Sequence, residues 1–272
     1  MSDIFALQKL QKKQNAKIDK DLENLISGLE KVYHEAERKL IKLLSNYKGD
    51  TIDASFALQN KRNIENILTE SGYYEVVEDF VSEFSQTLKT IKAEYELLSI
   101  KPKLSEAGKI SIQALNNVSI DAFALYERDV AQTIYNGILR TALTNVPLTE
   151  AISAAQALLQ DLSQAGKIRT IAETKYMEFI RGTEAIIAKD AGYNRFLYAG
   201  PIDDKIRPFC LDRVYKIYTR DEIDSMNNGQ IDEVFISGGG YNCRHKWIPV
   251  PDDFALTETE KNNFDKLRER VR

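Results

Sequence analysis

Two cysteines and a histidine are the residues of this chain with the most distinctive chemistry. Cys210 and Cys243 are the only cysteines among 272 residues, and His245 is one of two histidines. Thiolate sulfur and imidazole nitrogen are the ligands that zinc prefers in proteins. Cys243 and His245 are two residues apart, so they would share one face of a strand. Asp203, Asp204 or a water molecule could complete a tetrahedral zinc site with these three side chains.

Two other interpretations of the same cysteines stay open. The long spacing contains no Cys-x-x-Cys knuckle, and the two thiols can pack as small buried apolar groups with a structural role. A disulfide between them is the third interpretation, although a reducing cytoplasm opposes it. The sequence therefore requires no cofactor, and zinc is the one metal that these residues would suit. The other histidine, His34, lies among charged residues of an expected helix and is interpreted as solvated.

Polar residues flank both cysteines and are expected to hold the local backbone. Asp204 and Arg207 are three residues apart, and the pattern predicts an ion pair that fixes the turn before Pro208. Arg244 lies beside Cys243 and is expected to hold the glycine-rich segment at 238–240 by donating to its carbonyls.

Short apolar segments should bring the two cysteine regions together. Residues 196–199 and 247–248 read as strands that are too short to be stable alone. Pairing them would place the chain after Gly200 close to the chain before Trp247. We therefore expect Cys210, Cys243 and His245 to come together. The flexible glycine-rich segment would allow the loop between them to close.

The rest of the chain predicts a mainly α fold: long N-terminal helices of bundle or coiled-coil type, followed by a small α+β module. Residues 1–192 carry a sustained 3.6-residue apolar period that fades after Gly192, so 1–192 is expected to be a helical region that binds partners. Residues 193–272 are expected to form the α+β module, which ends in a C-terminal helix. The expected helices run over about 3–47, 60–68, from Gly72 to Lys101-Pro102, 104–146, 148–162 and 168–188. A short helix should also begin at Thr219, which has capping-box spacing to Glu222.

The first helix carries an apolar stripe that suggests a contact surface. The sequence offers this stripe no obvious packing partner beyond the following helix. Its members recur at helical spacing: Leu22, Leu25, Ile26, Leu29 and Val32. We expect part of the stripe to serve self-association or partner binding. Deleting residues 1–47 should then leave a folded C-terminal part.

Composition restricts the function classes. A net charge of -4 argues against a protein whose main task is to coat nucleic acid, which would usually be strongly basic. No run approaches the roughly 20 apolar residues that span a bilayer, and the start lacks the pattern of a signal peptide, so folding in a cytoplasm without a membrane partner is expected. The chain contains no GxSxG, HExxH, P-loop or GxGxxG element, and it is not expected to be an enzyme.

The segment 196–250 resembles the C-terminal module of the phage Mu protein F-like family, which includes minor head proteins of tailed phages. The matching elements occur in the family's order: Asp204, Arg207-Pro208-Phe209-Cys210, Asn242-Cys243-Arg244-His245 and Ile248-Pro249. Two positions depart from the family pattern. Arg207 stands where the family often has the first cysteine of Cys-Pro-x-Cys, and His245 stands at the second cysteine of Asn-Cys-Arg-Cys.

The resemblance implies a low-copy minor head (minor capsid) protein that acts in head morphogenesis. It implies a place near the portal inside the procapsid, and hence in the virion, with the host cytoplasm as the site of assembly. The implied partners are the portal, scaffold and capsid proteins, with DNA contact and homo-oligomers through the N-terminal helices as further expectations. Two other classes stay open: a DNA-binding or DNA-escort protein of the virion, and a metal-dependent enzyme of the head.

Overall fold

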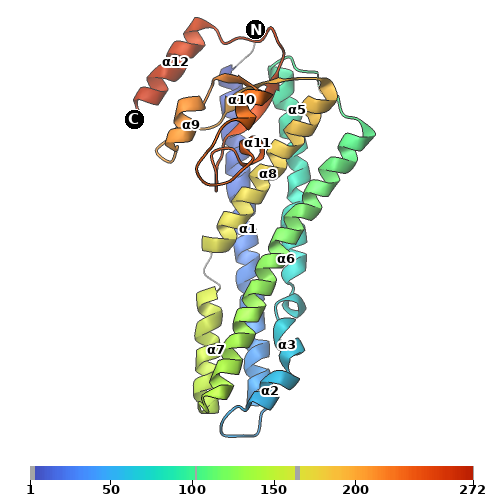
Figure 1. The fold of residues 1–272 in the computed structure, drawn as a ribbon, viewed down its shortest axis with the longest axis vertical. Coiled ribbons are helices and arrows are strands. Elements are labelled where there is room, and N and C mark those ends of the chain that lie inside the picture. Colours follow the sequence, from blue (N-terminus) through green and yellow to red (C-terminus); the bar gives the residue numbers. More distant parts are fainter. Residues whose placement is uncertain (1–3, 102, 163–165, 272) are drawn as a thin grey trace. The chain divides into compact units, whose positions relative to one another are not determined.

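The computed structural model describes residues 4–101, 103–162 and 166–271. Of the described residues 71% are helical, with long N-terminal helices and a small three-stranded sheet near the C-terminus, which confirms the predicted fold class. The helices are α1 (Ile4–Ser45), α2 (Ala54–Gln59), α3 (Lys61–Glu65), α4 (Tyr73–Ser82), α5 (Thr87–Leu97), α6 (Glu106–Leu143), α7 (Leu148–Leu162), α8 (Gly166–Ala191), α9 (Pro208–Arg213), α10 (Arg220–Asp224), α11 (Val234–Ser237) and α12 (Glu258–Glu269) (Figure 1).

The sheet contains β1 (Arg195–Ala199), β2 (Ile217–Thr219) and β3 (Lys246–Val250) in the order β2-β1-β3. Both pairings are antiparallel, and Tyr198 lies opposite Trp247 in the β1–β3 pair. This pairing joins the two short apolar segments that the sequence predicted to meet. Every residue of β3 is buried, so the strand is covered on both faces. Before residue 193, the only β-structure in the described chain is an isolated β-bridge between Thr51 and Pro147.

Two of the expected helices are divided. The expected helix at 60–68 is replaced by α2 and α3, which meet at Asn60, and by a 3₁₀ turn at Thr69–Ser71. The helix expected after Gly72 is divided into α4 and α5 by a 3₁₀ segment, Glu83–Gln86. Hydroxyls bond to nearby carbonyls at this break: Ser85 donates to Ser82 O and Thr87 donates to Phe84 O. Such local bonds offer the backbone an alternative to the helical ladder, and helical periodicity alone does not reveal them.

The chain divides into two compact units that are not continuous in sequence. Unit 1 comprises residues 1–21, 81–119 and 172–272, and unit 2 comprises residues 22–80 and 120–171. The predicted boundary at 192 therefore coincides with a change from helix to sheet and loop, whereas the compact units divide the chain elsewhere. The physical reason is that the long helices α1, α6 and α8 each contribute residues to both units.

Unit 2 is a bundle of helices that buries the apolar stripe of α1. Leu22, Leu25, Leu29 and Val32 are at most 4% exposed. Gly28 allows close contact with α4, because a Cβ atom there would lie 2.7 Å from Cγ1 of Val76. The stripe therefore packs inside the unit, and the expectation that it is a free contact surface is wrong. The sequence could not show this, because spacing along one helix does not reveal that Val76 of α4 packs against Gly28.

Unit 1 combines the sheet with the first turns of α1 and the later helices. Ile4, Leu7 and Ile18 are buried, so the first turns of α1 belong to the core of this unit. The ring of Phe264 in α12 stacks on that of Tyr215, with 3.9 Å between centroids, and holds the C-terminal helix to the module.

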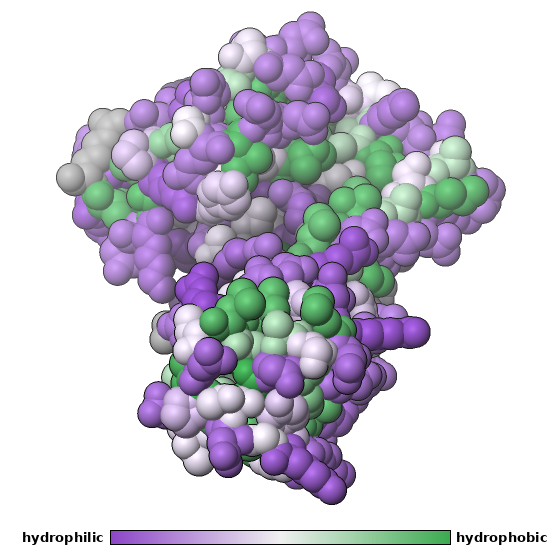
Figure 2. All heavy atoms as spheres, turned by 60° about the horizontal axis from the view of Figure 1, so that its bottom comes forward, coloured by the Kyte–Doolittle hydropathy of each residue, from purple (hydrophilic) through white to green (hydrophobic). Residues whose placement is uncertain are grey.

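On the face drawn in Figure 2, hydrophilic side chains predominate and apolar side chains gather in patches. Large apolar side chains that remain exposed include Leu58, Leu125 and Leu143 of unit 2 and Phe5 and Ile110 of unit 1. Within the described chain, no helix combines the length and the apolar character needed to cross a bilayer.

Candidate functional site

The predicted residues Cys210, Cys243 and His245 meet in a buried cluster in unit 1. Their ligand atoms all lie within 4.8 Å of one another, and the two sulfurs are 3.7 Å apart. Both cysteines are free thiols, so no disulfide joins them. The hydroxyl of Tyr198 lies 3.3 Å from Sγ of Cys210 and 3.6 Å from Sγ of Cys243. The imidazole of His245 stacks on the ring of Tyr198, with centroids 5.3 Å apart.

Local backbone geometry explains how the three side chains arrive at one place. Pro208 occupies the start of α9, where its missing N–H costs no hydrogen bond, and Cys210 follows within the same short helix. At the other end of the loop, Asn242 takes a left-handed conformation with φ of 55° and turns the chain toward β3. Asparagine tolerates that conformation better than most residues do. His245 then directly precedes β3, whose pairing with β1 places it beside Tyr198.

Arg181 of α8 organises the backbone around the cluster, although the sequence did not single it out. Its side chain is 1% exposed, and its guanidinium donates to the carbonyl oxygens of His245 (2.8 Å), Ile236 (2.9 Å) and Cys243. A planar guanidinium with five N–H donors can satisfy several carbonyls at once. One helical side chain therefore fixes three points of the loop that carries the candidate ligands.

The glycine-rich segment approaches the cluster so closely that side chains would clash. A Cβ atom on Gly239 would lie 2.3 Å from Sγ of Cys210, and its N–H donates to Sγ of Cys243 at 3.1 Å. Gly238 has φ of +60°, and a Cβ atom there would lie 2.9 Å from Cζ of Arg181. The glycines thus serve close packing against sulfur and guanidinium as well as loop closure.

The two thiols differ in acidity. A hydrogen bond with Cys210 holds the pKa of Cys243 well below its usual value, and the positive charge of Arg181 adds to this effect against the cost of burial. The same hydrogen bond, together with burial, raises the pKa of Cys210. Sγ of Cys243 accepts a hydrogen bond from the Gly239 amide, and a second hydrogen bond joins it to Sγ of Cys210.

The geometry fits a tetrahedral metal. Two sulfurs at about 2.3 Å from zinc, with a tetrahedral angle between them, lie about 3.8 Å apart, close to the 3.7 Å between these sulfurs. Nε2 of His245 is buried and has no hydrogen-bond partner in the described part of the chain. An unsatisfied buried nitrogen beside two sulfurs is the kind of atom that a metal would satisfy.

The two arginines beside the cysteines, Arg207 and Arg244, make different contacts from those that the sequence predicted. Arg207, and not Arg244, holds the glycine-rich loop, since it donates to the carbonyls of Gly239 (2.8 Å) and Tyr241. Arg244 instead forms a bidentate ion pair with Asp203, at 2.7 Å for both bonds. The predicted pair of Asp204 with Arg207 does not occur among the described residues.

This difference has a geometric cause and a consequence for the candidate site. Arg207 lies just before α9 in extended backbone, which points its side chain across the loop rather than back along the chain. The hydrogen bonds from Arg244 hold the pKa of Asp203 below its usual value. With its carboxylate bound to Arg244, Asp203 is not part of the cluster, and the described acidic residues add no fourth ligand to the three side chains.

A second buried polar network lies beside the cluster and was also missed. Lys246, the first residue of β3, contacts Glu94 of α5, Glu184 of α8 at 3.1 Å and Gln14 of α1 at 3.2 Å. Burial raises the pKa of Glu184 to about 8, despite the nearby charge of Lys246. Charged residues at buried helical positions were the available signal: Arg181 and Glu184 are one turn apart between the apolar residues Ile180 and Ile187.

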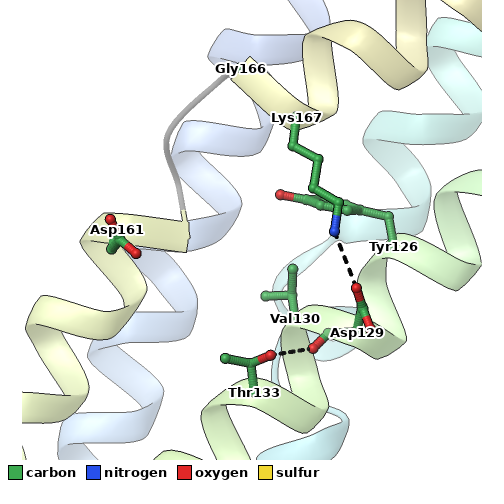
Figure 3. Close-up of a pocket in the computed structure, with 7 residues that line it drawn as sticks. All are labelled: Tyr126, Asp129, Val130, Thr133, Asp161, Gly166 and Lys167. Atoms are coloured by element: carbon green, nitrogen blue, oxygen red, sulfur yellow. Dashed lines mark hydrogen bonds and ion pairs between the residues drawn. The ribbon is translucent and has the colours of Figure 1, made fainter.

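Unit 2 contains a cavity of about 360 Å³, drawn in Figure 3. It is a weaker candidate for a functional site than the cysteine–histidine cluster. Lys167 points across it toward Asp129 (3.2 Å) and over the ring of Tyr126. Both members of this ion pair are more than 60% exposed, so solvent screens their charges. His34 is likewise exposed, with 80% of its side chain accessible, as the sequence suggested.

Comparisons with known proteins do not add to this geometry. The chain matches no protein-family model, no curated protein and no solved structure. The resemblance to the Mu protein F-like family therefore rests on the motif residues themselves.

Proposed function

We propose that this chain is a minor head protein of the phage Mu protein F-like type, a structural component that acts in head morphogenesis. The observation that carries the proposal is the closure of the two motif segments on each other. Arg207 binds the carbonyls of Gly239 and Tyr241, and Cys210 contacts Cys243 across the same loop. The residues that define the resemblance thus depend on one another physically, as residues of a shared module would.

The C-terminal module acts in this proposal as a rigid adaptor. Its loop is fixed at several points by Arg181 and Arg207, and such fixed loops lose little conformational entropy on binding. The partners are the portal, scaffold and capsid proteins, and the chain takes its place inside the procapsid after synthesis in the host cytoplasm. DNA contact and self-association remain part of the proposal, through surfaces other than the buried stripe of α1.

The test is incorporation into heads. Heads are purified from cells that carry the chain's own neighbouring genes, with this gene either intact or deleted, and the chain is quantified by mass spectrometry. We expect a low, fixed number of copies per head and a lower yield of filled heads on deletion. Absence of the chain from heads that assemble normally without it would overturn the proposal.

A zinc centre is a second candidate, favoured by the unsatisfied Nε2 of His245 beside two sulfurs at tetrahedral separation. Zinc held by Cys210, Cys243 and His245 would join α9 to the start of β3. In a chain whose module is already packed, it would add stability by binding only the folded state.

Metal analysis of the purified chain tests this candidate. We expect about one zinc per chain after refolding with zinc, and a cobalt–thiolate charge-transfer band when cobalt replaces it. His245→Ala should abolish both signals, whereas the matched control His34→Ala should retain them because that side chain is exposed. A metal content that His245→Ala leaves unchanged would reject the centre.

A further inference from the structure

A cavity of about 410 Å³ lies between the sheet and the C-terminal helix α12 of unit 1. Its apolar lining includes Ile217 of β2 and Phe254 and Leu256 of the segment that follows β3. Phe254 is half-buried. The volume falls in the range of about 300–1,000 Å³ that is typical of small-ligand sites.

The charged lining of this cavity is strongly biased toward one sign. Among the described residues, its charged lining consists of four cations, Arg195, Lys216, Lys261 and Arg268, and one carboxylate, Asp265. This is a local excess of three positive charges in a chain whose net charge is -4. Such a bias concentrates anions at the cavity.

Two of the cations are positioned by the protein backbone. Arg268 donates to Val214 O at 2.8 Å and pairs with Asp265, and only 12% of its side chain is exposed. Its Nε is buried and has no hydrogen-bond partner among the described residues. Arg195 donates to the carbonyl of Asp252 from the other wall. Guanidinium groups that are held in place suit the tetrahedral oxygens of a phosphate.

We propose that this cavity binds the terminal phosphate of a nucleotide, either free or at the end of a nucleic-acid strand. The phosphate lies between Arg195, Lys216 and Arg268, and the base lies against Phe254 and the apolar floor. A phosphate dianion matches the excess positive charge, and an aromatic ring is a general platform for stacking a base. This inference adds a ligand site to the chain and does not depend on its role in head assembly.

Isothermal titration calorimetry of the full chain tests the site with adenosine 5′-monophosphate and, for comparison, adenosine. A short single-stranded oligonucleotide with and without a 5′ phosphate distinguishes the two sources of the phosphate. The variant is Lys216→Glu, because Lys216 is exposed and forms no ion pair within the described chain. Lys205→Glu is the matched control, since it makes the same charge change on another exposed residue.

We expect the monophosphate to bind at least about tenfold more tightly than adenosine, with affinity that falls as salt rises. Lys216→Glu should weaken binding at least tenfold, and Lys205→Glu should change it less than twofold. Binding of the phosphorylated oligonucleotide as well would identify a strand end as a source of the phosphate, whereas binding of the monophosphate alone would identify a free nucleotide. Equal affinity for adenosine, equal effects of the two variants, or no binding of any phosphorylated probe would overturn the proposal.

Discussion

Replacing Arg181 by methionine should unfold the C-terminal module preferentially. Methionine keeps much of the length and apolar bulk of the side chain but removes all three hydrogen bonds to the carbonyls of His245, Ile236 and Cys243. A hydrogen bond from a charged group contributes about 1.5–3 kcal/mol, so three bonds amount to about 5–9 kcal/mol. Removing the buried charge also relieves part of its desolvation cost, and we expect a net loss of about 3–5 kcal/mol.

The single tryptophan of the chain makes this prediction easy to measure. Trp247 lies in β3, is fully buried and donates to Val234 O in the same loop region. Its fluorescence during urea unfolding therefore reports on the module. Arg181→Lys should recover less than half of the loss, because an ammonium cannot reproduce the planar fork. Arg270→Met, at an exposed arginine of the same unit, is the control. A loss under about 1 kcal/mol for Arg181→Met, similar to that of the control, would refute the reasoning.

Three further perturbations test other parts of unit 1. The pKa of Glu184 is raised to about 8 in the folded chain, so the unfolded state releases this proton at lower pH than the folded state does, and stability should fall as pH rises from about 5 to 8. Glu184→Gln should flatten that dependence in urea titrations across this range; an unchanged slope would contradict it. Gly239→Ala would place Cβ 2.3 Å from Sγ of Cys210 and should cost about 1–3 kcal/mol, whereas Gly166→Ala, with open space around it, should cost much less in the same thermal melts. Asp203→Asn should leave Arg244 without its charged partner and increase proteolysis of the 200–207 loop relative to Asp204→Asn; equal cleavage of the two variants would count against the ion pair.

The sequence predicted the features that depend on local pattern. Apolar periodicity located the long helices, its loss located the sheet, and the pairing of β1 with β3 followed from two short apolar segments. The convergence of Cys210, Cys243 and His245 followed from that pairing, because all three residues lie in the part of the chain that connects β1 to β3.

The features that depend on distant partners were not predictable in this way. The sequence marks Arg181 only as a charged residue among apolar helix positions, and its carbonyl partners become apparent only when the loop at 236–245 is folded over it. Sequence proximity suggested a pair of Asp204 with Arg207, yet loop closure gives Arg207 carbonyl partners more than 30 residues away. The buried stripe of α1 was assigned to a partner for the same reason, since helical spacing alone does not show which part of the chain covers it.

The interdependence of distant segments also changes what a truncation would show. Removing residues 1–47 deletes Ile4, Leu7 and Ile18 from the core of unit 1 and removes Gln14, which accepts a hydrogen bond from buried Lys246. Losing three buried aliphatic side chains costs at least about 2 kcal/mol each, which approaches the whole stability of an ordinary domain. The truncated chain should therefore lose native Trp247 emission and cooperative unfolding, contrary to the expectation from sequence that the C-terminal part folds alone. A truncated chain that kept both properties would show instead that β3 and α8 need no support from the start of α1, and that the module is autonomous.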